Sequence, residues 1–519
     1  MPPVFIWAPA VVVGLLMLLP PVYLLVRAME SGPGALDVLL SFRTLAILGR
    51  TTLLMAVVTG GCIVLGVSLA WLTLRSDLPF RKTFSTLLTL PLVMPSYVFA
   101  LIVVTALGPK GIAQGWLEPF GVDRLPSIYG LPGAALGLAL ISFPYVMLPV
   151  QAALRRMDLS VEEAARNLGR GPLDVLFAVT LPLLRPAIVA GALLVALYTL
   201  SDFGMVSLLR YQTFTWVIFL QYETTFDRSV AGALSLAPIG LALLILAVES
   251  RTRGSAAYHR ATPGAQRQPS LTPLGRWRWP AAAYAGAVVA ASLALPVALL
   301  LYWVVRGVSA GEPLDLLWSN TLNTVYVSAV AAAAAAVFGA PVAVLSVRYP
   351  GWASSALERL TYVGFALPGI AVALAFVFFG ASVLRPAYQT MFMLVAAYVV
   401  LFIPASAGST QAALRQVSPR MEEAARSLGK TSFHAFRLVT LPLLMRGVAA
   451  GAALVFLLTM KELPATLILS PTGFRTLATS VWSYASEAFF ARAAAPSLIL
   501  ILAAGVPMAF LITREQEER

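Results

Sequence analysis

The chain has 519 residues, of which 59% are hydrophobic and only 11% are charged. Soluble proteins carry about 25% charged residues, so this composition excludes a soluble globular protein and indicates a protein that crosses a membrane several times. The single cysteine, Cys62, lies in an apolar run and excludes an internal disulfide framework, while the net charge of +13 has to be judged by where the basic residues fall.

The first half of the chain contains six apolar runs, each long enough to cross a membrane. The first, 4–27, carries three prolines; we expect a retained span, with a cleaved signal peptide as the alternative, because no charged segment precedes it. The others are 51–74, 84–108, 131–154, 186–209 and 230–248. Pro91 and Pro95 predict a bend in the third run.

Residues 249–280 are rich in Arg, Gly, Pro, Ser and Gln and contain no apolar run, so they predict a flexible linker. Six more runs follow, near 281–305, 321–347, 361–384, 390–410, 447–469 and 493–512. We therefore predict an all-α polytopic bundle of about twelve spans in two tandem homologous halves. The halves are 1–248 (core 48–248) and 281–519 (core 317–512), related by an axis along the membrane normal with a pathway between them.

Basic residues gather on alternate connecting segments. Arg75, Arg81 and Lys82 follow the second run, six arginines lie in the linker, and segments on the opposite side are sparser, with Arg306 alone in one of them. This positive-inside pattern predicts a multi-pass protein of the cell (inner or plasma) membrane whose N-terminus, linker and C-terminus are cytoplasmic. The positive charge is thereby assigned to topology, and no nucleic-acid partner is expected.

Two polar stretches between apolar runs are copies of each other. Residues 151–184 and 411–444 share Glu-Ala-Ala, a following glycine and an identical Thr-Leu-Pro-Leu-Leu, all at one constant offset. Each copy predicts a short helix with small side chains on one face, N-capped by Asp158 or Ser160 in the first and by Ser418 in the second. A glycine in a left-handed turn would end each helix. The alternative is a solvated surface helix laced with salt bridges.

These loops resemble the EAA loops of ABC importer permeases. The matching residues are Glu163, Ala164, Ala165 and Gly169 in the first loop, and Glu423, Ala424, Ala425 and Gly429 in the second. The resemblance implies the type I ABC importer permease fold and loops that dock into a homodimer of separate ATP-binding cassette ATPase subunits. It also implies a periplasmic or extracellular solute-binding protein as a further partner. The chain itself would then be a transport subunit and not an enzyme.

The sequence predicts no catalytic, cofactor or metal site. Residues 424–431 (AARSLGKT) loosely fit a phosphate-binding loop, but they follow a membrane span and lack the preceding strand and the glycines that such a loop needs. His259 and His434 lie apart from any matching set of Cys, Asp or Glu and are expected to be exposed.

Three ionisable residues fall inside predicted spans, where they are costly and usually functional or paired. They are Asp202 in YTLSDFG and the neighbours Lys461 and Glu462 in LLTMKELPATLIL. Asp202 and Glu462 occupy equivalent positions of the two halves. One interpretation places the two carboxylates along the translocation pathway, with Lys461 offsetting them; the other is a structural ion pair between spans.

The resemblance is strongest to the fused iron(III) permeases, through stretches 91–101, 200–223 and 461–496. It implies iron(III) as the solute, with thiamine or another small solute as the alternative, and Arg475 stands where an acidic residue would be expected in the iron branch. The aromatic segments 210–229 and 472–492 are candidates for docking the binding protein or for packing at the membrane interface. A secondary transporter driven by an ion gradient is the alternative of another class, but it would not need twin EAA loops.

Overall fold

The computed structural model describes residues 4–30, 33–157, 159–225, 229–252, 271–312, 315–431, 434, 437–438 and 441–517. Secondary structure in these ranges is helical, apart from one isolated bridge between Ser76 and Thr272. Ten of the described helices are long and apolar enough to cross a membrane, or 11 if one bent pair is a single span. The all-α polytopic fold is confirmed, with a count slightly below the predicted twelve. Most of the predicted linker, 253–270, and Asp158 lie outside the described residues.

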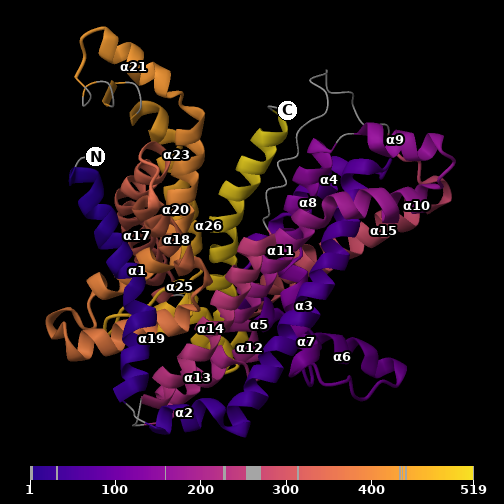
Figure 1. The fold of residues 1–519 in the computed structure, drawn as a ribbon. Helices are drawn as coiled ribbons and strands as arrows, with labels where there is room; N and C mark the ends of the chain where they lie inside the picture. The colour runs from indigo at the N-terminus through magenta and orange to yellow at the C-terminus, as the bar shows by residue number, and fades with distance from the viewer. Residues whose placement is uncertain are drawn as a thin grey trace. The chain divides into compact units, whose positions relative to one another are not determined.

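The helices form two compact units, and neither unit is one half of the sequence. Unit 1 comprises residues 1–45, 214–240 and 313–484, and unit 2 comprises residues 46–213, 241–312 and 485–519. Each unit is built mainly from one half and completed by helices from the ends of the other half (Figure 1). The two halves in chain order therefore correspond to the sequence repeat. Each compact unit, in contrast, contains outer helices that come from the other half.

Unit 1 is centred on α17 (Asp315–Arg348), α20 (Met391–Gln416) and α23 (Leu441–Met460), which pack against one another. The N-terminal helix α1 (Val4–Glu30) packs on α17 and on two further helices, α18 (Trp352–Ala366) and α19 (Gly369–Ser382). The segment closest to the N-terminus in sequence thus belongs to the unit of the second half.

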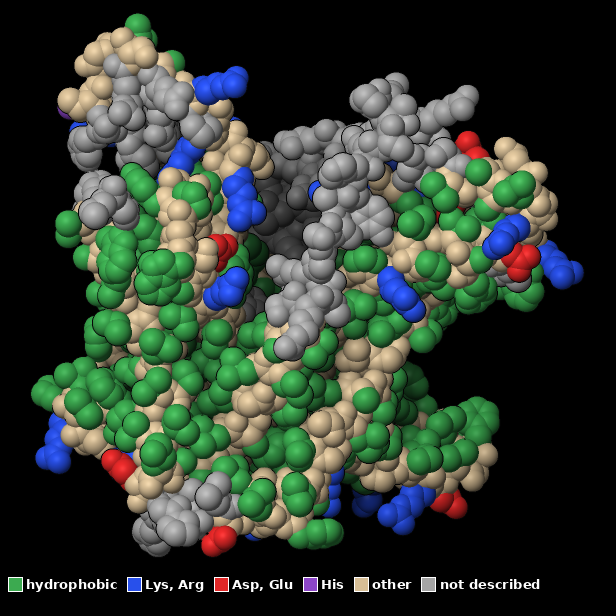
Figure 2. Space-filling view, viewed as in Figure 1, with side chains coloured by type: hydrophobic (Ala, Val, Ile, Leu, Met, Phe, Trp, Pro, Cys, Tyr) green, Lys and Arg blue, Asp and Glu red, His purple; other side chains and the backbone are tan. Residues whose placement is uncertain are grey.

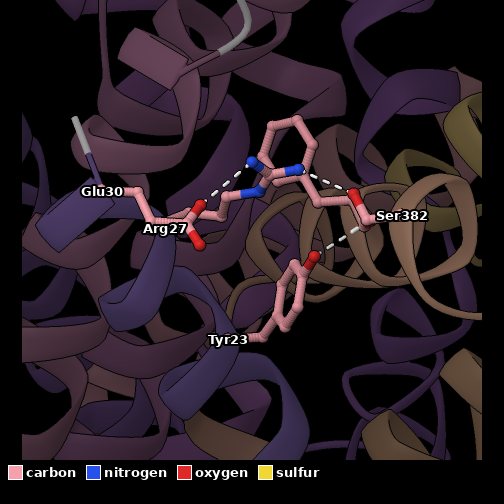
Figure 3. Close-up of polar contacts among 5 residues, drawn as sticks. Tyr23, Arg27, Glu30 and Ser382 are labelled. Carbon is pink, nitrogen blue, oxygen red and sulfur yellow. Dashed lines mark hydrogen bonds and ion pairs between the residues drawn. The ribbon is translucent and has the colours of Figure 1, made fainter.

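The last turns of α1 are fastened to α19 by polar and aromatic contacts (Figure 3). Arg27 donates a hydrogen bond of 2.7 Å to the Ser382 hydroxyl and pairs with Glu30 at 3.1 Å. Tyr23 donates to the backbone carbonyl of Phe378 at 3.2 Å. The guanidinium of Arg27 also lies over the rings of Tyr23 and Phe378.

In unit 2, α3 (Phe42–Arg75) and α11 (Leu181–Ser201) both pack against α8 (Pro144–Arg156). Helices α15 (Arg278–Val289), α16 (Leu295–Ser309) and α26 (Phe490–Glu517), which come from the second half, complete it, and α16 packs on α26. On the face shown in Figure 2, many of the side chains exposed along the helices are hydrophobic, which suits a protein whose helices are long and apolar enough to cross a membrane.

Glycines bring the three central helices of each unit close together. A Cβ on Gly66 or Gly191 would lie 2.8 Å or 2.7 Å from atoms of α8, so both α3 and α11 approach α8 backbone to backbone. Gly339 and Gly451 hold the equivalent places against Ser406 of α20. Small residues permit this approach between membrane helices, where packing and not water drives association.

Several predicted spans are broken or shorter than expected. The predicted run 84–108 becomes α4 (Arg81–Leu87), a 3-10 turn (Leu90–Val93) and α5 (Ser96–Leu107), interrupted at the prolines that predicted the bend. The equivalent run 361–384 bends by 105° between Gly364 and Gly369. Runs 186–209 and 447–469 stop at Ser201 and Met460 and continue as the short helices α12 (Gly204–Leu208) and α24 (Pro464–Leu469).

Candidate functional site

The twin loops fold alike. Helix α9 (Leu159–Asn167) and helix α21 (Pro419–Ser427) occupy matching positions, one in each unit. Gly169 and Gly429 follow them with φ of +82° and +79°, which confirms the left-handed turns predicted from the sequence. Ser418 precedes Pro419, and its hydroxyl accepts a weak hydrogen bond of 3.4 Å from the Arg420 amide.

The ends of the two helices have the same pattern of backbone hydrogen bonds. The amides of Leu168 and Arg170 donate to the carbonyls of Ala164 and Ala165 at 3.1 Å and 3.2 Å. In the second loop the amides of Leu428 and Lys430 donate to the carbonyls of Ala424 and Ala425 at the same two distances. This double closure satisfies carbonyls that a helix end leaves unpaired. Residues 164–170 and 424–430 therefore share the same backbone hydrogen-bond pattern.

Each loop exposes a leucine just before its turn. Leu168 is 83% exposed and Leu428 is 82% exposed. Glu163 and Ala164 are also exposed, whereas Ala165 is buried. Ala424 is exposed and Ala425 half-buried, while Glu423 is helical but its side chain is outside the described part. The exposed face is a small apolar surface with a leucine at its edge.

The first loop is closed by a buried contact between its two helices. The hydroxyl of Thr180 donates a hydrogen bond of 2.8 Å to the carboxylate of Glu162, and both side chains are buried. Thr180 ends a π-helical turn (Leu176–Thr180) that joins α10 (Pro172–Val175) to α11. Glu162 therefore fixes α9 to the start of a central membrane helix and does not present its charge to solvent.

Two side-chain contacts hold the base of each loop. Gln151 of α8 donates to the Thr73 hydroxyl at 3.0 Å, and Gln411 of α20 donates to the Ser346 hydroxyl at 2.9 Å. Next to them, Arg75 donates to the carbonyl of Leu154 at 3.1 Å, and Arg348 donates to the carbonyl of Val417 at 3.2 Å. We name these four contacts the base tethers.

The base tethers were not predicted from the sequence, although the residues that make them occupy matching positions in the two halves. Gln151 and Gln411 open the two repeated stretches, and Arg75 and Arg348 end matching spans. Their partners come from helices distant in the sequence, so a role could not be read from the repeat alone. The base tethers join α3 to α8 in one unit and α17 to α20 in the other, and α8 and α20 lead directly into the loops.

The acidic residues predicted inside spans cap short helices in both units. Asp202 accepts a hydrogen bond of 3.0 Å from the Met205 amide, and Glu462 accepts one of 3.0 Å from the Ala465 amide. Asp202 is buried, and Glu462 is half-buried against Gly369, where a Cβ would lie 2.9 Å from its carboxylate oxygen. Helix N-termini favour negative charge, so both carboxylates lie where backbone amides stabilise them.

Other predicted features are placed as follows. Lys461 is half-buried between Met460 and Glu462, directly after α23. His434 is exposed, and its ring nitrogen lies 3.0 Å from the Thr431 hydroxyl. No group of three His, Cys, Asp or Glu side chains suited to a metal ion occurs among the described residues. Residues 424–427 are helical, so the described part of AARSLGKT lacks the shape of a phosphate-binding loop.

Comparison with known proteins identifies relatives along the whole chain. The model of a family described as "binding-protein-dependent transport system inner membrane component" matches residues 62–310 and 332–513, one copy after the other. The Fe(3+)-transport system permease protein FbpB 2 of Haemophilus influenzae is 34% identical over 515 residues, which is 98% of this chain and 98% of that protein.

Two other relatives match less of the chain or with lower identity. The ferric transport system permease protein FbpB of Actinobacillus pleuropneumoniae is 24% identical over 444 residues, 81% of this chain and 64% of that protein. The molybdenum transport system permease protein ModB of Escherichia coli is 32% identical over 190 residues, 35% of this chain and 82% of that protein.

Proposed function

We propose, from the premise that the chain belongs to the family of binding-protein-dependent transport system inner membrane components, that it carries iron(III) across the cell membrane. It is a multi-pass ABC permease with two tandem copies of the family domain. In the proposed transporter a binding protein delivers the solute, and separate ATPase subunits supply the energy at the twin loops. The N-terminus, linker and C-terminus would lie in the cytoplasm, because the basic residues concentrate on the connections of that side.

The observation that carries the coupling proposal is the matching short helix and left-handed glycine turn of the two loops, at residues 159–170 and 419–430. A symmetric dimer of ATPase subunits offers the same cleft twice, so it requires the same ligand twice. The turns at Gly169 and Gly429 and the exposed Leu168 and Leu428 meet that requirement. The base tethers would then transmit a pull on the loop to the central membrane helices, because they join both at one point.

The iron proposal rests on the extent of similarity. The relative that transports Fe(3+) by name matches the whole chain, including both halves and the linker, whereas the molybdenum permease matches about a third of it. We also propose that Asp202, Lys461 and Glu462 line the translocation pathway. This is supported by their position at the points where α11 and α23 stop within predicted spans.

The coupling proposal is tested by replacing the exposed leucines. The double variant Leu168→Asp/Leu428→Asp is expected to lose co-purification with the ATPase subunit and to lower ATP hydrolysis stimulated by binding protein by at least tenfold, because charge in an apolar contact is costly. Phe120→Asp is the control, since Phe120 is similarly exposed on another loop. Unchanged hydrolysis and co-purification in the leucine variant would rule out docking at these loops.

The substrate is tested in proteoliposomes that contain the complete transporter and its binding protein. Radioactive iron(III), molybdate and thiamine are supplied in separate reactions, each with and without ATP. ATP-dependent uptake of iron alone is the expected result. Uptake of molybdate or thiamine without iron would leave the permease assignment intact and overturn the iron assignment.

A further inference from the structure

A cluster of arginines and tryptophans stands at the start of the first span of the second half. A 3-10 turn (Gly275–Trp277) leads into α15, and the membrane-length run extends over Gly275–Ser309. Trp277 is 62% exposed and Trp279 is 71% exposed, and Arg276 and Arg278 are exposed between them. Arg276 lies over the Trp277 ring at 5.9 Å from its centre. Two large rings and two charges thus face outward at the very end of a span.

This cluster is held in place by the segment before it. The Thr272 amide donates to the Arg75 carbonyl at 2.8 Å, and the Asp77 amide donates to the Thr272 carbonyl at 3.3 Å. The Leu274 amide donates to the Asp77 carboxylate at 2.8 Å. These bonds form the parallel bridge between Ser76 and Thr272 and fix the approach to α15. The segment that carries the arginines and tryptophans is therefore held to residues 75–77 by these hydrogen bonds.

A second element adds cations beside the first. Helix α15 packs against α4, which begins with Arg81 and Lys82 and is preceded by the exposed Phe80 at φ +55° (Figure 1). Lys82 is exposed and Arg81 is half-buried. Within stretches 75–89 and 271–289 the single acidic residue is Asp77, whose carboxylate already binds the Leu274 amide. We name Phe80, Arg81, Lys82 and residues 276–279 the RWRW surface.

The chemistry of the RWRW surface matches a lipid headgroup region. Tryptophan rings concentrate at membrane–water interfaces, and exposed Lys and Arg next to a span attract anionic headgroups. Arginine can bind a phosphate group through two parallel hydrogen bonds. A zwitterionic headgroup also carries a phosphate, but it has no net charge and therefore adds no net electrostatic attraction. We propose that the RWRW surface is a binding site for the headgroups of anionic phospholipids. The bridge at Thr272 also connects this surface to Arg75, whose guanidinium makes one of the base tethers.

The experiment measures lipid retained by the purified full-length chain. Delipidated protein in detergent is titrated with phosphatidylglycerol or phosphatidylcholine, and bound lipid is counted by native mass spectrometry. Arg276→Gln/Arg278→Gln is expected to weaken phosphatidylglycerol binding about tenfold and to leave phosphatidylcholine binding unchanged. Lys110→Gln/Arg124→Gln removes two exposed cations elsewhere and is expected to change phosphatidylglycerol binding less than twofold.

Further arms separate the possible occupants. Trp277→Ala/Trp279→Ala tests the interfacial role, and it is expected to weaken binding of phosphatidylglycerol even though it keeps every charge. Inorganic phosphate at the same concentration as the lipid is expected not to compete; full competition would assign a free-anion site and overturn the proposal. Equal losses in both arginine and control variants would overturn it too. So would loss of ATPase subunit binding with lipid retention unchanged, because the surface would then be a protein interface.

Discussion

At the scale of single residues, the base tethers explain how a polar loop is held at the end of an apolar bundle. Gln151 and Gln411 are buried, and the side-chain amide of each donates a hydrogen bond to a hydroxyl of the neighbouring helix. An unpaired polar group in such a place costs free energy, so the hydrogen bond specifies one register of the helix pair. Two copies of the same solution indicate that the register matters to both loops.

Removal of a tether should lower stability modestly. We expect Gln151→Ala and Gln411→Ala each to lower the free energy of unfolding by about 1 kcal/mol, as for hydrogen bonds between membrane helices, and the two losses to add because the sites lie in separate units. Unfolding in mixed micelles measures the loss. Gln416→Ala, at an exposed site, is the control, and equal losses at Gln416 would remove the special role of the tethers.

The acidic caps allow charge and hydrogen bonding to be separated. Asp202→Asn and Glu462→Gln keep an oxygen for the Met205 and Ala465 amides, so we expect unfolding free energies within about 0.5 kcal/mol of the parent. If the carboxylates line the pathway, these variants lower iron uptake in proteoliposomes. Alanine at either site should lower both stability and uptake. Full uptake by the Asn and Gln variants would leave the residues as structural caps.

The sequence predicted the residues whose role is local and missed those whose role depends on a distant partner. Gly169 and Gly429 were predicted in left-handed turns because a helix with a polar face stopped there, and their φ angles confirm it. The burial of Glu162 was not predicted, because its partner Thr180 is reached only after the chain turns back. The same limit hid the base tethers.

At the scale of elements, glycine decides how closely the central helices approach. Gly191 of α11 and Gly451 of α23 lie where any side chain would meet backbone atoms of α8 or α20. Such contacts cannot be relieved by a side-chain rotation, because the obstructing atoms belong to the main chain of a neighbouring helix. The glycines therefore set the spacing of each trio.

Alanine at these glycines should separate the helices. A Cβ on Gly191 would lie 2.7 Å from the Tyr145 carbonyl oxygen, and one on Gly451 would lie 2.9 Å from the Ser406 backbone. We expect Gly191→Ala and Gly451→Ala each to cost about 1–3 kcal/mol of unfolding free energy, measured in mixed micelles. Gly60→Ala, where nothing lies within 4 Å, is the matched control and should be neutral or slightly stabilising. A loss at Gly60 equal to the others would show that the close contacts at Gly191 and Gly451 are not the cause of the destabilisation.

Broken spans mark the limit of hydropathy. The runs 84–108 and 361–384 are both strongly apolar. Pro91 and Pro95 predicted a bend in the first run, but the angle of 105° between the two helices of the second run was not predicted. Hydropathy measures whether a segment suits an apolar environment, which holds equally for a straight span and for short helices buried among others. Helix α5 is of the second kind, since most of its side chains are buried within unit 2.

At the scale of the whole molecule, the exchange of outer helices could not be predicted from the repeat. Tandem copies with the same hydropathy pattern fit equally well whether α1 packs in its own half or in the other. The contact of Arg27 with Ser382 and that of Tyr23 with Phe378 show that α1 packs on helices of the second half. These contacts join residues more than 350 positions apart in the sequence. Folding of unit 1 therefore has to wait for the second half of the chain, because its core lies there.

Cutting the chain in the linker should leave the protein intact. We expect a protease site inserted between residues 258 and 268 to be cleaved without separating fragments on size exclusion, because helices of the first half complete unit 1 and helices of the second half complete unit 2. Residues 281–519 expressed alone lack α1 and should aggregate, and co-expression of residues 1–260 should rescue them. The control is the uncut chain carrying the same site. A monodisperse 281–519 fragment with the unfolding midpoint of the full chain would show that α1 is dispensable to the unit on which it packs.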